Sequence, residues 1–235
     1  MRQVWEDLLF AHWPVDPDAL RLMLPANLQL DLYDGRAWVG LVPFRMSGVG
    51  ARLIPSEFSP FPELNVRTYV VHGGKPGVWF FSLDAAHALT VWGARKFFHL
   101  PYLLAGMACE EQEGWIHYRS TRNPVDAEIH KTTAASPARL LARYRPVGEV
   151  FEAQPGSLEH FLAERYSLYA RDSRGGLLRC EVHHPPWPLQ PAEAVFDENT
   201  MLSAAGFTVS ALQPELLHFS RRQHVVVWPP SLIER

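Results

Sequence analysis

The sequence predicts an α+β fold built on a large, mainly antiparallel sheet that curls on itself in a barrel-like way. Strand patterns outnumber helix patterns, the 20 prolines are spread along the chain, and 47% of the 235 residues are hydrophobic. Scattered prolines suit short strands joined by tight loops, and a chain of this length can bury a sizeable core. Because Gly, Ser and Pro never accumulate into a long linker, we expect a single domain over residues 1–235.

The N-terminal part is expected to hold a strand or helix, a second short helix and a hairpin. The apolar run Trp5–Trp13 fits either a strand or a short helix, and Pro14 ends it. A helix is expected over Asp16–Leu24, because Asp16 can cap it and Pro17 suits its first position. The hairpin should have strands at Leu28–Tyr33 and Ala37–Met46 and a turn at Asp34–Gly35.

Strands and a few helices should alternate in the rest of the chain. The strands are expected at Phe61–Val71 and Gly77–Leu83, paired across a glycine-rich turn, and at Ala108–Glu111, Trp115–Arg122, Leu177–His183 and Leu217–Trp228. Helices are expected at Ala85–Phe98 (capped by Asp84), Ser157–Ala170 and Asn199–Ala205. In Ser157–Ala170 one side is apolar, with Leu158, Phe161, Leu162, Tyr166 and Tyr169.

Charge and composition exclude several classes of protein. The net charge of −3 disfavours nucleic acid, which needs clustered cations. No uncharged run is long enough to span a bilayer, and Glu6 and Asp7 interrupt the first apolar stretch, unlike a signal peptide. Cys109 and Cys180 lack metal or redox spacing and suggest thiols in a reducing compartment. We expect a cytoplasmic protein whose partner is a small molecule rather than nucleic acid or membrane; homo-oligomerisation stays open.

The segment Phe61–Val71 carries the most informative polar pattern. Alternate side chains of a strand face opposite sides, so Glu63, Asn65, Arg67 and Tyr69 share one face. These groups can hold a small polar ligand, although the same alternation describes an ordinary half-exposed strand. If the row lines a pocket, Glu63 and Arg67 should share hydrogen bonds with each other, with Asn65 or with the ligand, because an unpaired buried charge is costly.

Histidine spacing gives no metal-binding motif. His183 and His184 are adjacent and would face opposite sides of a strand, and neither His-x-His nor His-Glu-x-x-His occurs. His12, His72, His99 and His183 could still converge in space, but hydrogen-bonded histidines near a core are more common. We predict a protein without bound zinc or iron and without a cofactor.

Several long blocks of the chain resemble the YqjF-like family of uncharacterised proteins. The blocks are Leu9–Val15, Ala37–Phe44, Glu63–Val70, Gly77–Asp84 and Glu181–Leu189, with His218–Ser220 beyond them. They are rich in Trp and His and cover nearly the whole chain. The family is grouped with the acetoacetate decarboxylase fold, a β-barrel-like α+β domain with an internal cavity. The resemblance implies the same architecture here.

The resemblance also implies that the amine chemistry of the decarboxylases is lost. Those enzymes have an Arg-Glu pair and, after it, a Pro followed by two lysines, the first of which forms a Schiff base. Arg95 and Pro101 keep this spacing, but Lys96 stands where Glu is expected. Tyr102 and Leu103 stand where the lysines are expected, and neither can form an imine. We therefore predict no decarboxylation of acetoacetate through an imine.

None of the three lysines of the chain is expected to take the place of the Schiff-base lysine. Lys96 is expected near the end of a helix, where a solvated lysine is favoured by the helix dipole; a nucleophilic Lys96 is the minor alternative. Lys75 lies in a Gly-Pro turn and Lys131 in a polar segment.

Two classes of function remain open. In the first, an enzyme acts on a small carboxylate or carbonyl compound, with Glu63, Arg95 and Tyr102 as catalytic residues. Glu63 resembles a pocket glutamate of the decarboxylases and would be the general acid or base, Arg67 or Arg95 would clamp the anion, and Tyr102 or a histidine would polarise an oxygen.

In the second class the protein binds a small organic molecule without turnover. The expected ligand-binding residues are Asn65, Arg67, Tyr69, His12 and His183. The two classes differ in whether Glu63 has a raised pKa in a closed apolar cavity or is neutralised by Arg67. A third, purely structural interpretation treats Glu63 and Arg67 as an ion pair that stabilises the fold.

Overall fold

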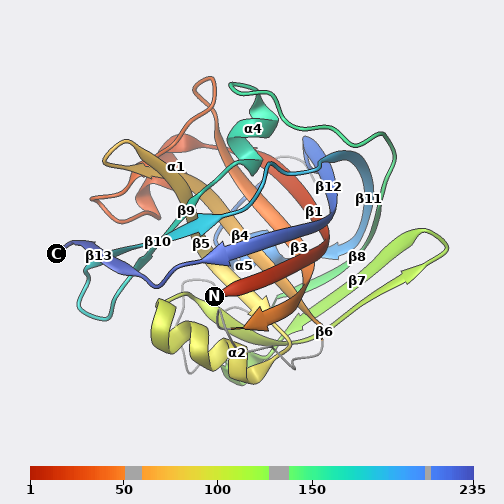
Figure 1. The fold of residues 1–235 in the computed structure, drawn as a ribbon, viewed down its shortest axis with the longest axis horizontal. Coiled ribbons are helices and arrows are strands. Elements are labelled where there is room, and N and C mark those ends of the chain that lie inside the picture. Colours follow the sequence, from red (N-terminus) through yellow and green to blue (C-terminus); the bar gives the residue numbers. More distant parts are fainter. Residues whose placement is uncertain (51–59, 127–137, 210–212) are drawn as a thin grey trace.

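A computed structural model describes residues 1–50, 60–126, 138–209 and 213–235 of the chain, and these residues form a 13-stranded sheet with short helices at its ends (Figure 1). The strands are β1 (Arg2–Val15), β2 (Gln29–Leu30), β3 (Ala37–Gly50), β4 (Phe61–His72), β5 (Lys75–Ala85), β6 (Tyr102–Gln112), β7 (Trp115–Arg122), β8 (Arg139–Pro146), β9 (Ser167–Arg171), β10 (Leu177–His183), β11 (Gln190–Asn199), β12 (Leu216–Val227) and β13 (Ser231–Glu234). The helical segments are α1 (Pro17–Leu22), α2 (Ala88–Gly93), the π-helix η1 (Ala94–Phe98), α4 (Leu158–Ala163) and α5 (Met201–Ala204). Within the described strands, only the pairs β5–β6 and β5–β9 are parallel. The predicted α+β class with a large, mainly antiparallel, curled sheet is confirmed.

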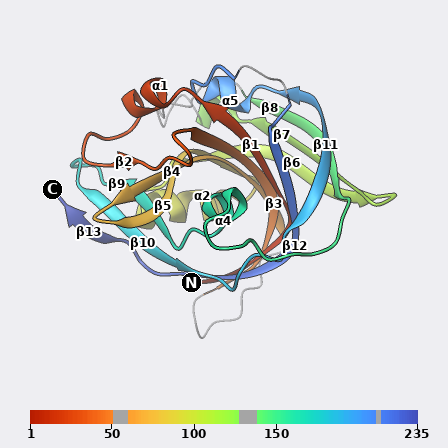
Figure 2. The ribbon, with the colours of Figure 1, turned by 90° about the horizontal axis from the view of Figure 1, so that it is seen from above.

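The strand pairings close the sheet into two rings that share a wall. A large ring runs through β4, β5, β6, β7, β8, β11, β12, β1 and β3. A small ring runs through β4, β5, β9, β10, β12, β1 and β3, because β5 also pairs with β9 and β10 also pairs with β12. The view from above shows strands encircling a centre in which α2 and α4 are seen (Figure 2). The shared wall is formed by β1, β3, β4, β5 and β12.

Each ring encloses a hydrophobic core of its own, so the shared strands are buried on both faces. On β4, Leu64, Val66 and Val70 pack into the core of the large ring. The alternate side chain of Tyr69 packs into the core of the small ring. An alternating pattern of polar and apolar residues therefore does not mark a half-exposed strand here: Glu63 is 2% exposed and Arg67 is 6% exposed.

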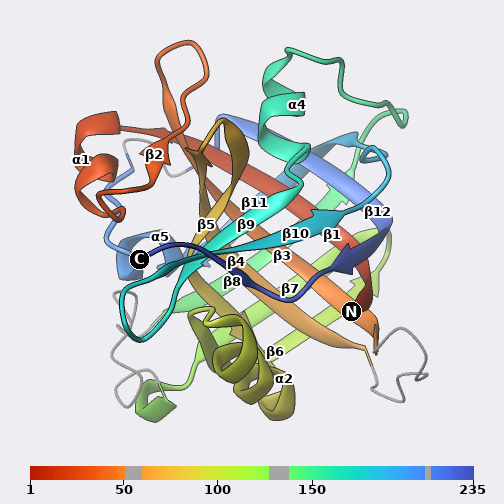
Figure 3. The same cartoon turned by 60° about the vertical axis from the view of Figure 1, so that its left-hand side comes forward.

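The small ring is covered at its two ends by different helices. Figures 1 and 3 show α4 near one end and α2 near the opposite end. Helix α2 begins after His87, whose imidazole Nδ1 accepts a hydrogen bond from the Thr90 N–H. Helix α4 begins after Ser157, whose hydroxyl accepts from the His160 N–H. Any site inside the small ring is therefore reached past one of these two helices.

Several local predictions are confirmed. Asp16 caps α1 by accepting a hydrogen bond from the Asp18 N–H, with Pro17 at the start of the helix. The segment Trp5–Trp13 lies in β1, so the strand alternative holds. Strands β4 and β5 form the expected hairpin, and β6 and β7 meet across a turn at 113–114.

The hairpin predicted over 28–46 is wrong. Strand β2 is only Gln29–Leu30 and pairs with β4 rather than with β3. Strand β3 has no edge left for it, because β1 and β4 already occupy its two sides. Only an isolated bridge between Tyr33 and Arg36 marks the Asp-Gly turn.

Two helix predictions are wrong in part. Asp84 does not cap a helix. It lies in β5, and its carboxylate accepts two hydrogen bonds from Arg122. The expected helix over 157–170 stops at Ala163, because Glu164 leaves the helical conformation with ψ 77°. Of the apolar residues predicted to continue the helix face, Tyr169 belongs to β9, whose residues are buried, and Tyr166 directly precedes that strand. Strands β8, β11 and β13 had no clear sequence pattern and were missed.

No helix in the described ranges has the length and hydrophobicity needed to cross a membrane.

Candidate functional site

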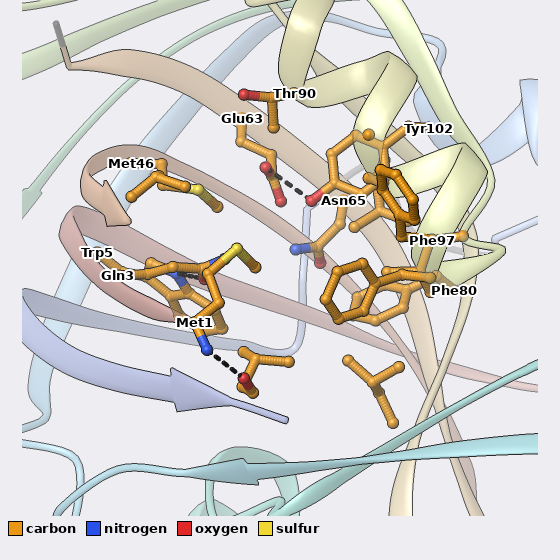
Figure 4. A pocket seen from close by; sticks show the side chains of 18 of the residues that line it. Met1, Gln3, Trp5, Met46, Glu63, Asn65, Phe80, Thr90, Phe97 and Tyr102 are labelled. Atoms are coloured by element: carbon orange, nitrogen blue, oxygen red, sulfur yellow. Dashed lines mark hydrogen bonds between the residues drawn. The ribbon is translucent and has the colours of Figure 1, made fainter. Parts of the chain in front are cut away.

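The small ring contains a cavity of about 260 Å³ at its α2 end. Residues from every strand of the small ring line it, together with residues of α2 and η1. Its walls are mainly apolar and include Trp5, Phe44, Met46, Phe80, Phe97 and Phe98. Figure 4 shows Glu63, Asn65 and Tyr102 directed into this apolar space. A cavity of this size fits a compact molecule with few polar groups.

Glu63 and Tyr102 form the polar centre of the cavity. The Tyr102 hydroxyl donates a hydrogen bond of 3.0 Å to Oε2 of Glu63. Glu63 comes from β4, and Tyr102 is the first residue of β6, which pairs with the end of β5. The backbone of Glu63 is fixed from the large ring, because the Tyr118 hydroxyl donates to its carbonyl oxygen at 2.7 Å.

Burial makes Glu63 a weak acid. Removal of its carboxylate from water raises the pKa of Glu63 to about 8, and the hydrogen bond from Tyr102 offsets only part of this rise. The negative charge of Asp84 raises the pKa of Glu63 further. Burial also raises the pKa of Tyr102 well above its usual value, and Glu63 adds to the rise. At neutral pH the pair is therefore a carboxylic acid and a phenol, each with a proton to donate.

Asn65 adds an acceptor beside this pair. Its side chain lines the cavity and is 5% exposed. Its Oδ1 atom is buried and has no hydrogen-bond partner among the described residues. A buried amide oxygen without a partner costs about 1–3 kcal/mol, so a ligand that donates a hydrogen bond to Asn65 would recover that energy.

The second half of the polar row lies at the α4 end of the small ring. Arg67 and Tyr69 do not line the cavity. Tyr69 forms a hydrogen bond of 2.6 Å with Nε2 of His12, and the Arg67 guanidinium donates to the carbonyl oxygen of Leu162 in α4 at 3.3 Å. Gly40 permits this packing, because a Cβ atom there would lie 3.1 Å from Nε2 of His12.

Arg67 carries a buried charge without a carboxylate partner in the described part of the chain. Its Nε atom is buried and forms no hydrogen bond with the described residues. The guanidinium lies 5.3 Å from the ring of Phe10 and 5.8 Å from that of Tyr69. Such cation–π contacts contribute about 0.5–2 kcal/mol, whereas an unpaired buried ion costs several kcal/mol. The aromatic rings therefore offset only part of the cost of burying Arg67.

Of the partners expected for Glu63 and Arg67, the direct pairing with each other is wrong, whereas pairing with a ligand stays a prediction. Glu63 bonds to Tyr102, while Arg67 is directed toward α4. The two residues lie four positions apart, about 13 Å along an extended strand, and the β4–β5 pairing changes register between them, at Val66 and Arg67. The structural interpretation of Glu63 and Arg67 as a stabilising ion pair is wrong for the same reason.

Arg95 was expected to enter the site from the end of its helix, and it does not. Its guanidinium forms an ion pair with Asp126, with contacts of 3.0 and 2.5 Å. Its Nε atom donates to the main-chain carbonyl of Tyr102 at 2.7 Å. Asp126 in turn accepts from the Leu104 N–H at 2.8 Å. Arg95 therefore fixes the start of β6 from outside the cavity, a role that no local sequence pattern indicated.

The other candidates lie away from the cavity. His183 on β10 and Lys96 on η1 are both exposed, and neither lines the cavity that contains Glu63. Lys75 forms an ion pair with Glu181 at 2.6 Å, and Lys131 lies outside the described residues. Within the described ranges, no group of three His, Cys, Asp or Glu side chains is arranged to hold a metal ion.

Comparison with protein families gives a match over residues 2–224 to DUF2071, described as an uncharacterized conserved protein. The chain belongs to this family. A curated relative, the uncharacterized protein YqjF of Bacillus subtilis (strain 168), is 46% identical over 232 residues, which are 97% of this chain and 90% of that protein. The family match and this relative confirm the resemblance to YqjF-like proteins.

Solved structures similar to this DUF2071 protein share its fold at low sequence identity. Acetoacetate decarboxylase from Legionella pneumophila has a TM-score of 0.63 at 12% identity, covering 99% of this chain and 87% of that chain. The enduracididine biosynthesis enzyme MppR complexed with pyruvate has a TM-score of 0.63 at 14% identity, covering 98% and 89%. The acetoacetate decarboxylase-like architecture is therefore shown, and these likenesses concern the fold alone.

Proposed function

We propose that the cavity at the α2 end binds a compact, largely apolar carbonyl compound and that Glu63 transfers protons to and from it. The observation that carries this proposal is a buried carboxyl group with a pKa of about 8 inside an apolar cavity. A raised pKa without a neutralising arginine favours an acid–base role for Glu63 over a purely structural one. MppR, which shares the fold, is complexed in its solved structure with pyruvate, a small molecule that also carries a carbonyl group.

The two polar groups suit proton exchange next to a carbonyl. The Tyr102 hydroxyl would donate a hydrogen bond to the carbonyl oxygen of the ligand. The ionised form of Glu63 would remove a proton from the adjacent carbon, leaving an enolate on that oxygen. It would then return a proton, or a deuteron once the carboxyl group has exchanged with D₂O. No co-reactant is needed, and a base with a pKa near 8 is stronger than an ordinary carboxylate.

Hydrogen–deuterium exchange tests this proposal directly. Small ketones such as butanone and cyclohexanone would be incubated with the protein in D₂O, and deuterium entry next to the carbonyl followed by NMR. We expect exchange that increases with pH up to a plateau above about pH 8, where Glu63 is ionised. Glu63→Gln should lower the exchange rate by about 10²-fold or more.

Glu110→Gln is the matched control, because Glu110 is exposed on β6 and outside the cavity. It should leave exchange unchanged. If thermal shift shows that the ketones bind but no exchange occurs, the alternative of a binding protein without turnover is established instead. Equal exchange by the wild-type and Glu63→Gln proteins would refute the role of Glu63.

A further inference from the structure

We propose that the α4 end of the small ring is a second site, which binds a small monovalent anion of the size range from chloride to acetate, with Arg67 as its main ligand. This site is distinct from the cavity at the α2 end. Arg67, Tyr69 and His12 do not line that cavity, whereas Glu63 and Asn65 do. The proposal therefore does not depend on the proton transfer assigned to Glu63.

The first argument is an excess of positive charge at this end of the ring. Arg67 and Arg165 are 6% and 7% exposed. Asp31 accepts from Nη1 of Arg165 at 2.6 Å and so neutralises one of the two guanidinium groups. No carboxylate lies within ion-pair distance of Arg67 in the described ranges, so one buried positive charge remains. An anion would neutralise it.

Nearby titratable groups do not supply the missing negative charge. Burial, the charge of Arg67 and His218 together hold the pKa of His12 well below its usual value, so His12 is neutral. Burial lowers the pKa of His218 as well, against the opposing charge of Glu159 in α4, and Glu159 is not within ion-pair distance of Arg67. Glu164, next to α4, binds other groups than Arg67: it accepts hydrogen bonds from the Tyr166 hydroxyl at 2.5 Å and the Trp187 N–H at 2.8 Å.

The second argument is that two guanidinium groups lie near the same aromatic ring, and each has one nitrogen without a hydrogen-bond acceptor among the described residues. The Arg67 and Arg165 guanidinium groups lie 5.8 and 5.0 Å from the centre of the Tyr69 ring. Nε of Arg67 and Nη2 of Arg165 are buried without a hydrogen-bond partner among the described residues. Forked guanidinium donors match carboxylates and other small anions. A neutral molecule such as water could accept these hydrogen bonds but would leave the charge of Arg67 uncompensated.

The surroundings also set the size of the anion. Phe10 and Tyr69 pack against the Arg67 guanidinium, which donates a hydrogen bond to α4. A ligand at this place must fit between buried side chains, so chloride, formate and acetate are suitable. Gluconate carries the same charge but is too bulky, which makes it a suitable reference anion.

The test measures the melting temperature of the full chain in increasing sodium chloride, formate or acetate. Total ionic strength is kept constant with sodium gluconate. A ligand that binds only the folded state raises the melting temperature with its concentration. We expect at least one small anion to raise the melting temperature relative to gluconate, and Arg67→Met to abolish that difference. Arg119→Met is the matched control, because Arg119 is exposed on β7, and should respond like the wild-type protein.

Either of two results would overturn the proposal. One is a wild-type protein with the same melting temperature in all four anions. The other is an Arg67→Met protein that keeps the wild-type response. If Arg67→Met does not fold, Arg67→Lys provides the test instead. This variant keeps the positive charge but loses the forked donors, so half-saturation of the rise in melting temperature should need at least about tenfold more anion. An unchanged half-saturation in Arg67→Lys would also contradict the proposal.

Discussion

The two ends of the small ring place the same strand in opposite electrostatic surroundings. At the α2 end, Glu63 faces aromatic side chains and a phenol, and its carboxyl group stays protonated up to about pH 8. At the α4 end, Arg67 faces Arg165 and two aromatic rings, with no carboxylate within reach in the described structure. One end therefore holds an extra proton and the other an extra positive charge.

This difference shows that neighbours from distant segments, rather than the strand itself, determine the chemistry of each position. Glu63 and Arg67 are four residues apart on one face of β4, which is about 13 Å along an extended strand. Here Tyr102 from β6 binds Glu63, and α4 binds Arg67. The small ring thus holds Glu63 and Arg67 at opposite ends, although their place on one face of the strand suggested that they pair.

The largest expected effect on the pH dependence of stability comes from replacing Glu63. Its pKa is about 8 in the folded protein and near 4.5 in a free chain. Between these pH values the folded state binds more protons than the unfolded state, so this residue makes the free energy of unfolding fall as pH rises. Glu63→Gln removes this dependence. From pH 5 to 8 the variant should therefore gain about 4 kcal/mol relative to the wild-type protein, at about 1.4 kcal/mol per pH unit.

Denaturant unfolding at each pH measures this difference. The buried histidines His12, His184 and His218 act in the opposite direction: their pKa values are lowered by burial, so they destabilise the fold as pH falls. They are present in both proteins and cancel in the comparison. A difference in stability that stays constant from pH 5 to 8 would show that Glu63 is ionised in the folded protein.

The second prediction compares Arg67 with a paired buried arginine. Arg122 is fully buried and binds the carboxylate of Asp84 through contacts of 2.7 and 2.8 Å. Arg122→Met would leave Asp84 as an uncompensated buried acid and should cost about 3–5 kcal/mol of stability. Arg67→Met removes no ion pair and should change stability by less than about 2 kcal/mol in gluconate buffer. Equal losses, measured by urea unfolding, would mean that Arg67 has a counter-ion within the protein.

The third prediction concerns the ion pair that fixes the cavity wall from outside. Arg95 and Asp126 are 20% and 17% exposed, and together they bind the backbone of Tyr102 and Leu104. Asp126→Asn should lower stability by about 1–3 kcal/mol, because charge-assisted hydrogen bonds to the start of β6 are weakened.

The exposed pair of Arg139 and Glu198 provides the control for Asp126→Asn. The Arg139 side chain is 61% exposed and lies 3.4 Å from Glu198. Arg139→Met should therefore cost less than about 1 kcal/mol. If Asp126→Asn is equally mild, the pair does not hold β6 in place, and the position of Tyr102 has another cause.

The sequence predicted that the polar side chains of β4 share one face, but it did not show that they are divided between the two ends of the small ring. Alternation along Phe61–Val71 placed Glu63, Asn65 and Arg67 on one face, and the structure buries all three. It could not show that the other face is buried too, because closure of two rings depends on pairings between strands far apart in the chain. The change of register beside Arg67 and the partnership of Arg95 with Asp126 are likewise non-local. Apolar spacing after Ser157 failed as a helix signal because a strand buried on both faces looks similar.

The smallest effect should come from the hydroxyl group of Tyr102. Tyr102→Phe removes the hydrogen bond to Oε2 of Glu63 and should lower stability by about 0.5–1.5 kcal/mol. Because that hydrogen bond lowers the pKa of Glu63, the variant should raise it further. The pH range over which the free energy of unfolding falls should then extend to more alkaline pH than in the wild-type protein. Tyr118→Phe is the matched control, because the Tyr118 hydroxyl binds the main-chain carbonyl of Glu63 and not its carboxyl group. It should cost a similar amount of stability without extending the pH range. An equal extension in both variants would show that the hydrogen bond from Tyr102 does not determine the pKa of Glu63.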